Sequence, residues 1–250
     1  MFKASISNAK SFKDVLSAIA TLIDEATFEI TPEKISLREM DPSRVAMVDF
    51  EWPKTLFEEF ECAESTKICI NLSEFLKLLK RTRKDDSIEL RLDEKTGRLS
   101  LRLMGRYTRA FNMPTLEATI EEVPTPKIEF NVKAKVTTDG LKEAIEDSSL
   151  VSDNVQIEAE EERLVFSAKG DIMGATIEMK KGSDVLLEIM VKEPSKATFS
   201  LNYLSDIVKA ASATAELVTL EFSSNMPIKL DFHQIEGGKL VYYLAPRIEA

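Results

Sequence analysis

The sequence is poor in the residues that hold metals and form disulfide bonds. Its 250 residues include two cysteines and one histidine, whereas a structural zinc site needs about four Cys or His ligands. The spacing of Cys62 and Cys69 fits no paired zinc knuckle. We therefore expect no metal and no cofactor, and two reduced thiols in or near strands. A disulfide between the two cysteines is the alternative.

Long apolar runs are also missing. No run approaches the roughly 18 apolar residues that a membrane-spanning helix requires. Residues 1–5, Met-Phe-Lys-Ala-Ser, are not followed by the apolar stretch of a signal peptide. These two features predict a soluble intracellular protein that makes no membrane contact.

The sequence lacks the common catalytic motifs. It contains no Walker loop and no GxSxG, HExxH or GxGxxG pattern. His233 ends an alternating stretch, residues 229–233, which is typical of a strand surface rather than a catalytic site. The acidic pairs at 85–86 and 121–122 could bind a metal, but adjacent carboxylates in loops are usually solvated. We expect no catalytic residue and no enzymatic activity.

What the sequence does contain is a divergent internal repeat. Residues 72–80, LSEFLKLLK, and residues 201–209, LNYLSDIVK, place apolar residues and a final lysine at matching positions. Residues 12–19 and 140–145 also correspond, and each is followed by two short alternating strands, 27–30 and 35–37 in the first half and 155–158 and 164–167 in the second. Each half therefore reads as strand, helix, strands, helix, strands. The pattern predicts two copies of one α+β domain, at 1–117 and 128–250.

Residues 113–127 between the copies have few periodic apolar residues and contain three prolines. Proline fixes φ and removes a hydrogen-bond donor, so we expect an extended connector over the surface. The composition fits a simple tether and a docking strip equally well. Gly237-Gly238 lies between two strand-like runs and predicts a hairpin turn.

Charge is unevenly distributed. The net charge is −10, which by itself argues against binding to phosphates. Nevertheless five cations fall within residues 77–84, on and after an apolar pattern at 72–79 that predicts a helix burying Leu72, Phe75, Leu76, Leu78 and Leu79. We expect that helix to show Lys77, Lys80, Arg81 and Lys84 on its other face, with Arg83 nearby. They either stabilise a solvated helix end or contact phosphates.

The other expected helices are less basic. A first helix with its apolar face at Phe12–Ile23 shows Lys10 and Lys13. A third, at about 139–149, carries Lys142 but also Glu143, Glu146 and Asp147. A fourth, at about 202–212, carries Lys209 and Asp206. The basic signal therefore lies mainly in the first half.

Four stretches bring a family into view: residues 37–45, LREMDPSRV; residues 71–80; residues 199–204, FSLNYL; and residues 238–249, GKLVYYLAPRIE. Together they resemble the archaeal and eukaryotic DNA sliding clamp, proliferating cell nuclear antigen, over essentially the whole chain. The resemblance implies a DNA clamp fold with two similar domains. It also implies three chains in a ring, with helices lining the channel and antiparallel sheets outside.

The resemblance also implies two sets of site residues. The expected groove for partner peptides consists of Met40, Arg44, Val45, Met47, Pro227, Tyr243, Ala245, Pro246 and Ile248, with Val123 and Pro124 from the connector. Met, Val, Tyr and Pro make an apolar, adaptable lining suited to a peptide turn with aromatic anchors. The expected cations at the DNA are Lys10, Lys13, Lys77, Lys80, Arg81, Arg83, Lys84 and Lys209. Glu143 and Glu146 replace cations usual in the family, so we expect the second domain to contact DNA less.

The implied function is that of a DNA polymerase processivity factor. Its expected partners are double-stranded DNA, bound without sequence preference, and DNA polymerase, the clamp loader, flap endonuclease and DNA ligase, bound through short peptide motifs. The expected location is the archaeal cytoplasm at the nucleoid, or the nucleus for a eukaryotic source. A subunit of a heterotrimer is a close alternative, and a metal-dependent hydrolase or a protein-only adaptor is a remote one.

Overall fold

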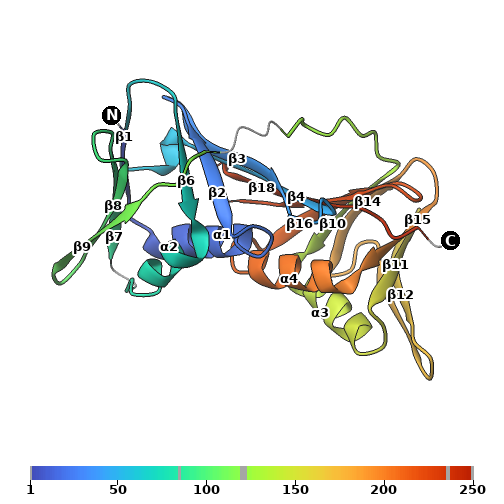
Figure 1. Ribbon diagram of the computed structural model, residues 1–250. Helices are drawn as coiled ribbons and strands as arrows, with labels where there is room; N and C mark the ends of the chain where they lie inside the picture. The colour runs from blue at the N-terminus through green and yellow to red at the C-terminus, as the bar shows by residue number, and fades with distance from the viewer. Residues whose placement is uncertain (1, 84–85, 119–122, 235–236, 249–250) are drawn as a thin grey trace. The chain divides into compact units, whose positions relative to one another are not determined.

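The computed structural model describes residues 2–83, 86–118, 123–234 and 237–248 (Figure 1). The chain forms two compact units. Unit 1 comprises Met1–Glu39, Val48–Val123 and Gln234–Lys239, and unit 2 comprises Met40–Met47, Pro124–His233 and Leu240–Ala250. Each unit combines antiparallel sheets with two helices, which confirms the α+β prediction.

The elements of the first half of the chain begin with a strand and a helix. In order they are β1 (Phe2–Ile6), α1 (Ala9–Ile19), β2 (Glu25–Ile30), β3 (Lys34–Met40), β4 (Ala46–Pro53), a 3₁₀ turn (Lys54–Leu56), β5 (Glu59–Cys62), β6 (Thr66–Asn71), α2 (Leu72–Leu79), β7 (Ser87–Asp93), β8 (Arg98–Met104) and β9 (Thr108–Pro114).

The second half of the chain runs through the same order. Its elements are β10 (Val132–Thr137), α3 (Thr138–Ser149), β11 (Asn154–Glu160), β12 (Arg163–Lys169), β13 (Gly174–Lys180), β14 (Leu186–Val191), β15 (Ser195–Ser200), α4 (Leu201–Ala211), β16 (Leu217–Phe222), β17 (Ile228–Phe232) and β18 (Lys239–Leu244). Both halves therefore read strand, helix, five strands, helix, three strands.

The sheets repeat as closely as the element order. The first half has strand orders β5-β1-β7-β8-β9 and β4-β3-β2-β6, and the second half has β14-β10-β16-β17-β18 and β13-β12-β11-β15. Each strand of the first half thus has a counterpart at the same place in the second. In this correspondence β9 matches β18, and β4 matches β13. The duplication read from the sequence is present in the topology.

Alternating side chains fix the register of these sheets. In β8 the residues Leu99, Leu101 and Leu103 are buried, while Arg98 before them and Arg102 between them are exposed. Leu101 lies opposite Leu90 of β7. Because strand side chains alternate with a period of two, a slip by one residue would turn the leucines outward, so burial specifies this pairing.

The helices begin at side-chain caps. Asn8 accepts a hydrogen bond from the amide of Ser11, Asn71 from that of Glu74, and Thr137 from that of Gly140. These caps satisfy amides that have no partner within the helix. In unit 1 α1 packs beside α2, and in unit 2 α3 packs beside α4 (Figure 1).

Two helices end earlier than the apolar pattern predicts. α1 stops at Ile19, so Leu22 and Ile23 are buried in the following turn. α2 stops at Leu79, where Thr82 turns back: its amide and its hydroxyl both donate to the carbonyl of Leu79, the hydroxyl at 2.7 Å. The expected continuation of α2 is therefore wrong over 80–83, and residue 84 lies outside the described residues.

Other details of the prediction are also corrected. Leu76 and Leu78 are half-buried rather than buried. His233 follows the last residue of β17, and its amide donates to the carbonyl of Leu217. β17 and β18 pair as antiparallel neighbours, which confirms the expected hairpin, and Gly237 between them has φ +84. Cys62 in β5 and Cys69 in β6 are free thiols, as expected.

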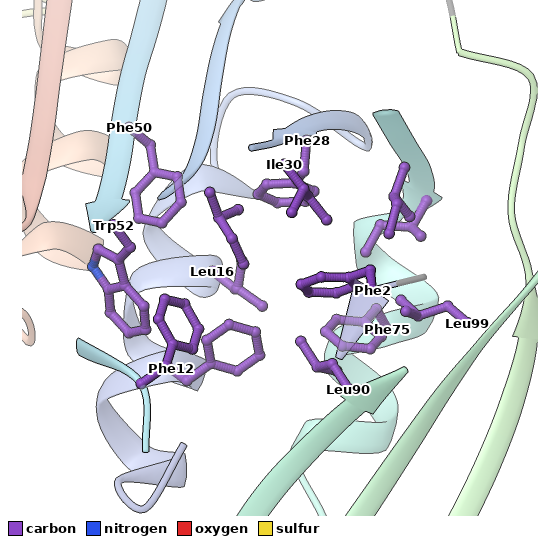
Figure 2. Close-up of a pocket in the computed structure, with 14 residues that line it drawn as sticks. Phe2, Phe12, Leu16, Phe28, Ile30, Phe50, Trp52, Phe75, Leu90 and Leu99 are labelled. Carbon is purple, nitrogen blue, oxygen red and sulfur yellow. The ribbon is translucent and has the colours of Figure 1, made fainter. Parts of the chain in front are cut away.

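The core of unit 1 is an aromatic cluster. The ring centroids of Phe12, Phe50 and Phe57 each lie 5.8–6.0 Å from the centroid of Trp52. The centroid of Phe75 lies 6.4 Å from that of Phe12. Their rigid shapes leave a cavity of about 40 Å³ lined only by apolar side chains (Figure 2). A cavity without polar partners gives water no hydrogen bonds and should stay dry.

Phe75 joins this cluster to α2, and its side chain is 1% exposed. We predict that Phe75→Ala lowers the free energy of unfolding by about 3–5 kcal/mol, because it removes buried apolar surface and enlarges a cavity. Chemical denaturation followed by circular dichroism measures the change. Ser73→Ala, at an exposed position of the same helix, should change it by less than about 0.5 kcal/mol. Equal effects of the two substitutions would contradict the importance of the cluster.

Candidate functional site

The basic surface of unit 1 lies on α1, on α2 and on the turn that follows α2. Lys10, Lys77, Lys80, Arg81 and Arg83 are exposed, and Lys13 is half-buried. α1 and α2 pack side by side, so the structure brings these cations onto neighbouring elements. Lys84 lies outside the described residues.

Nearby carboxylates reduce the charge of part of this surface. Lys10 pairs with Asp14 at 2.6 Å, Lys13 approaches the same carboxylate at 3.9 Å, and Lys77 pairs with Glu74 at 2.5 Å. Exposed pairs of this kind are weak and exchange readily with other anions. Among the described residues, Lys80 and Arg81 form no ion pair, which makes this turn the least compensated part of the surface.

The turn after α2 is held by an ion pair that the sequence did not reveal. Asp86 is buried, accepts a hydrogen bond from the amide of Arg83 at 2.9 Å, and forms a salt bridge with Arg109 of β9. The expectation of a solvated acidic pair is wrong for Asp86. The cause is Arg109, which also donates to the carbonyl of Arg81. Asp85 and the pair Glu121-Glu122 lie outside the described residues.

An exposed aromatic ring completes this corner of unit 1. The guanidinium groups of Arg83 and Arg109 lie 5.6 Å and 5.4 Å from the centroid of the Tyr107 ring. Such cation–π contacts orient both guanidinium groups while leaving their charge in place. Together with the ion pair, they fix a positive corner beside β9, which is the last strand of its sheet.

The helices of unit 2 are predominantly acidic. Lys209 is exposed on α4, as is Asp206. α3 exposes Asp139, Glu143, Glu146 and Asp147, while its Lys142 is half-buried. Glu143 and Glu146 therefore lie at the surface, and the two units differ in the sign of their helix charges.

The expected groove residues of unit 2 lie on adjoining segments. The amide of Ala245, directly after β18, donates to the carbonyl of Val45 at 2.9 Å. Tyr243 of β18 lies opposite Lys229 of β17, and Pro227 directly precedes that strand. The structure thus brings the 40–47 segment, the end of β18 and the start of β17 together.

The expected groove residues differ in how exposed their side chains are. Met40, Arg44 and Ile248 are exposed, with Ile248 at 82%. Val45, Pro227, Tyr243, Ala245 and Pro246 are half-buried. Met47 is 4% exposed, so it supports the surface from below. The exposed and half-buried members form an apolar surface with one cation.

The connector is described on both sides of residues 119–122. Leu116 forms an isolated bridge to Cys69 of β6, and this fixes where the connector leaves unit 1. Val123 is half-buried and Pro124 is exposed.

Asp41 organises the 40–47 segment. Its buried carboxylate accepts four hydrogen bonds, from the amides of Ser43, Val45 and Ala46 and from the hydroxyl of Tyr203 on α4. Burial alone would raise the pKa of Asp41, but these four hydrogen bonds outweigh it and hold the pKa below the usual carboxyl value. The carboxylate is therefore ionised at neutral pH.

The same segment contains a residue in an uncommon backbone conformation. Arg44 has φ +56, in the left-handed region, where a residue other than glycine costs on the order of 1–3 kcal/mol. The hydrogen bonds of Asp41 offset this cost. The sequence reasoning missed Asp41 and Tyr203 as a pair. The Asp-Pro-Ser order is a turn signal for Asp41, but nothing in the sequence pairs residue 41 with residue 203.

A second hollow lies on the sheet of unit 2. It has a volume of about 360 Å³ and is lined by Lys133, Lys135, Glu188, Met190, Thr219, Glu221, Lys229, Asp231 and His233. His233 Nε2 lies 2.7 Å from the hydroxyl oxygen of Thr219, and Lys229 pairs with Glu221 at 2.5 Å. Charges of both signs alternate here, which is typical of a solvated sheet face.

The described part of the chain holds no cluster of three or more potential metal ligands. It also contains no helix that is long and apolar enough to cross a membrane.

Comparison with known proteins gives consistent matches along the chain. Residues 1–119 match the family model of the N-terminal domain of proliferating cell nuclear antigen, and residues 124–247 match that of its C-terminal domain. A protein named DNA polymerase sliding clamp 1 from Pyrobaculum aerophilum is 39% identical over 242 residues, 97% of this chain and 96% of that protein. The DNA polymerase sliding clamp of Thermofilum pendens is 38% identical over 251 residues and covers both chains completely.

The fold gives the same result as the sequences. The crystal structure of proliferating cell nuclear antigen from Thermococcus kodakaraensis matches with a TM-score of 0.94 at 30% identity, over 99% of this chain and 100% of that one. The family models and the relatives span both halves of the duplicated architecture. The chain belongs to the proliferating cell nuclear antigen family.

Proposed function

We propose that this chain is one subunit of a homotrimeric ring that encircles duplex DNA and acts as a processivity factor for DNA polymerase. The ring has no catalytic activity of its own. It tethers replication and repair proteins to the DNA on which it slides. The observation that carries the proposal is the duplicated topology, which leaves each chain with two complementary strand edges.

The duplication indicates how one chain joins the next. Within unit 2, Ala245 after β18 donates to Val45 before β4, and within unit 1, Lys239 of β18 pairs with Asp49 of β4 at 2.7 Å. The counterparts of these strands are β9 and β13, and each is the last strand of its sheet. An unpaired edge is a template for another strand. Pairing β9 of one chain with β13 of the next would repeat the arrangement already made within the chain.

The two edges are also complementary in charge. Beside β9 lie Arg83 and Arg109. α3, which packs against β13, exposes Glu143 and Asp147. A head-to-tail interface between the edges brings opposite charges together and closes into a ring when the rotation per subunit fits. The acidic residues of α3 would then attract the arginines beside β9 of the next chain, whereas they would repel the phosphates of DNA.

The sequence-independent grip on DNA follows from the cations of α1, α2 and α4. Lys10, Lys13, Lys77, Lys80, Arg81, Arg83 and Lys209 are suited to phosphates, which carry no sequence information. Lys84, from the same basic run, is proposed with them. A closed ring cannot leave the duplex sideways, so weak contacts suffice and permit sliding. The net charge of −10 disfavours adsorption of DNA at other surfaces.

Partner proteins are proposed to dock at the apolar surface around the 40–47 segment. Met40, Val45, Pro227, Tyr243, Ala245, Pro246 and Ile248 supply apolar contacts, Met47 supports them, and Val123 and Pro124 extend the surface along the connector. Arg44 can pair with a partner carboxylate or carbonyl. DNA polymerase, the clamp loader, flap endonuclease and DNA ligase are the proposed partners.

Tethering raises the effective concentration of a partner at the DNA. In this proposal the domains span 1–117 and 128–250, with the connector at 113–127, and the ring works in the archaeal cytoplasm at the nucleoid.

The first prediction concerns assembly. The purified chain should have three times the 28.1 kDa subunit mass in sedimentation equilibrium or native mass spectrometry, because two edges per chain pair head to tail. A stable lone monomer would reject the homotrimer. If a monomer becomes a ring only when mixed with related chains from the same cell, the heterotrimer is correct.

The second prediction concerns the grip on DNA. Reversing Lys77, Lys80 and Arg81 to Glu should reduce stimulation of polymerase on primed circular DNA by about tenfold or more, because phosphate contacts are replaced by repulsion. The control reverses Lys95, Lys192 and Lys196, which are exposed away from the helices, with the same change in charge. If the helix variant stimulates normally, the chain is a protein-only adaptor.

The third prediction concerns the docking surface. Tyr243→Ala and Pro246→Ala should each weaken binding of a synthetic peptide with one helical turn and two aromatic side chains by about tenfold, a typical loss for a central interface contact. Calorimetry measures the affinity. Leu187→Ala, which truncates an exposed apolar side chain on β14, is the matched control. Unchanged affinity in the first two variants would reject this surface.

A further inference from the structure

The 40–47 segment is built around one carboxylate. Asp41 is 5% exposed. Its Oδ1 accepts hydrogen bonds from the amides of Val45 and Ala46, both at 2.7 Å, and its Oδ2 accepts one from the amide of Ser43 at 3.1 Å. The backbone closes around it, since the amide of Asp41 donates to the carbonyl of Ala46 and the amide of Arg44 to the carbonyl of Asp41, both at 2.9 Å.

The fourth hydrogen bond to this carboxylate comes from a distant element. The hydroxyl of Tyr203, in the first turn of α4, donates to Asp41 Oδ2 at 2.8 Å. The two residues are 162 positions apart in the sequence. The other three bonds arise within the segment itself, whereas this one attaches the segment to a helix.

Tyr203 is well suited to act as a fixed donor. The hydrogen bond to the Asp41 carboxylate, assisted by burial, raises the pKa of Tyr203. The phenol therefore keeps its proton over the whole physiological range. A charge-assisted bond from a neutral phenol to a carboxylate is stronger and shorter than a bond between neutral groups. Its rigid ring spans the gap between α4 and the segment with only two rotatable side-chain bonds.

The residues that depend on this bond are those of the docking surface. Arg44 has φ +56, a conformation that relaxes when its surroundings loosen. The carbonyl of Val45 accepts from Ala245 at 2.9 Å, so a displaced segment would also release the residue that leads to Pro246. Met40 directly precedes Asp41. The hydrogen bond of Tyr203 therefore joins α4 to the segment that contributes Met40, Arg44 and Val45 to the proposed lining.

We propose that Tyr203 is a positioning residue for partner binding. Its hydroxyl fixes the Asp41-centred segment in the conformation that the peptide recognises, without touching the peptide. This inference rests on the docking surface proposed above. It adds a determinant on α4, a helix whose exposed Lys209 is proposed to contact DNA, so the two activities of the subunit share one helix.

The test uses Tyr203→Phe in the full-length assembly, because this change removes one oxygen and keeps the ring. In the peptide-free protein, the amides of Val45 and Ala46 should exchange hydrogen faster than in the unsubstituted protein. Affinity for the two-aromatic peptide in calorimetry should fall by about tenfold, in line with the loss of a hydrogen bond to a charged group. Native mass and polymerase-independent retention on circular DNA should not change.

Two controls make the result specific. Thr96→Val removes an exposed hydroxyl of unit 1 that donates to the carboxylate of Asp93 at 2.7 Å, and it should change neither the exchange nor the affinity. Asp41→Asn keeps an oxygen acceptor but loses the charge. If Tyr203 acts through Asp41, the double variant of Tyr203→Phe and Asp41→Asn should lose less affinity than the two single losses combined. Additive losses would overturn the coupling.

The remaining outcomes separate this inference from the proposed function. Normal affinity of Tyr203→Phe, with or without faster exchange, overturns a role of Tyr203 in partner binding. Failure of the unsubstituted protein to bind the peptide overturns the docking surface, and with it the positioning role, even if exchange at Val45 still responds to Tyr203→Phe. Unchanged exchange and unchanged affinity together show that the Tyr203 hydroxyl holds nothing in place.

Discussion

The architecture depends on one constraint, which is that the amide and carbonyl groups along a sheet edge need partners. The duplicated topology places β9 and β13 at such edges, while their counterparts β18 and β4 make contacts within the chain. Among its described residues, a chain with this arrangement lacks hydrogen-bond partners at the outer edges of β9 and β13, and a second copy can supply a strand to each. In the proposed ring, the edge chemistry, with Arg109 on β9 and an acidic α3 beside β13, would make pairing between copies more favourable than pairing with an unrelated strand. In the proposed ring, assembly is therefore a continuation of the internal fold.

The helices of the two units also differ in charge. In unit 1 the uncompensated cations gather at Lys80 and Arg81, at a turn held by Asp86 and Arg109. In unit 2 the exposed carboxylates of α3 outnumber the cations. A uniformly positive inner surface would bind DNA more tightly, but each additional phosphate contact also steepens the salt dependence and slows movement along the duplex. In the proposed ring, an uneven grip would allow movement along the DNA that it encircles.

The sequence predicted much of this structure because its signals are local. Alternation in residues such as Leu99, Leu101 and Leu103 predicts strands, the apolar spacing of 72–79 predicts α2, and the matching of 72–80 with 201–209 reveals the duplication. The errors arose where distant residues decide. α2 ends at Leu79 because of Thr82, and Asp86 is buried because Arg109 reaches it from β9. The bond between Asp41 and Tyr203 joins two positions whose relation only the folded chain establishes. The expected groove residues came from the resemblance, while the expected DNA residues came from the basic run at 77–84 together with the resemblance, and both sets remain predictions.

The way the units divide the chain also has a consequence for biosynthesis. Unit 1 takes in Gln234–Lys239, and unit 2 combines Met40–Met47 with Leu240–Ala250. Neither unit can be completed until the segments Gln234–Lys239 and Leu240–Ala250 have been synthesised. Contacts of such high sequence separation fold slowly, and the growing chain exposes unpaired strands while it waits. A truncated product, lacking only its final strand, would leave both units unfinished. Synthesis past β18 would thus act as a quality control for the proposed ring, because a chain that stops before this strand lacks a finished unit.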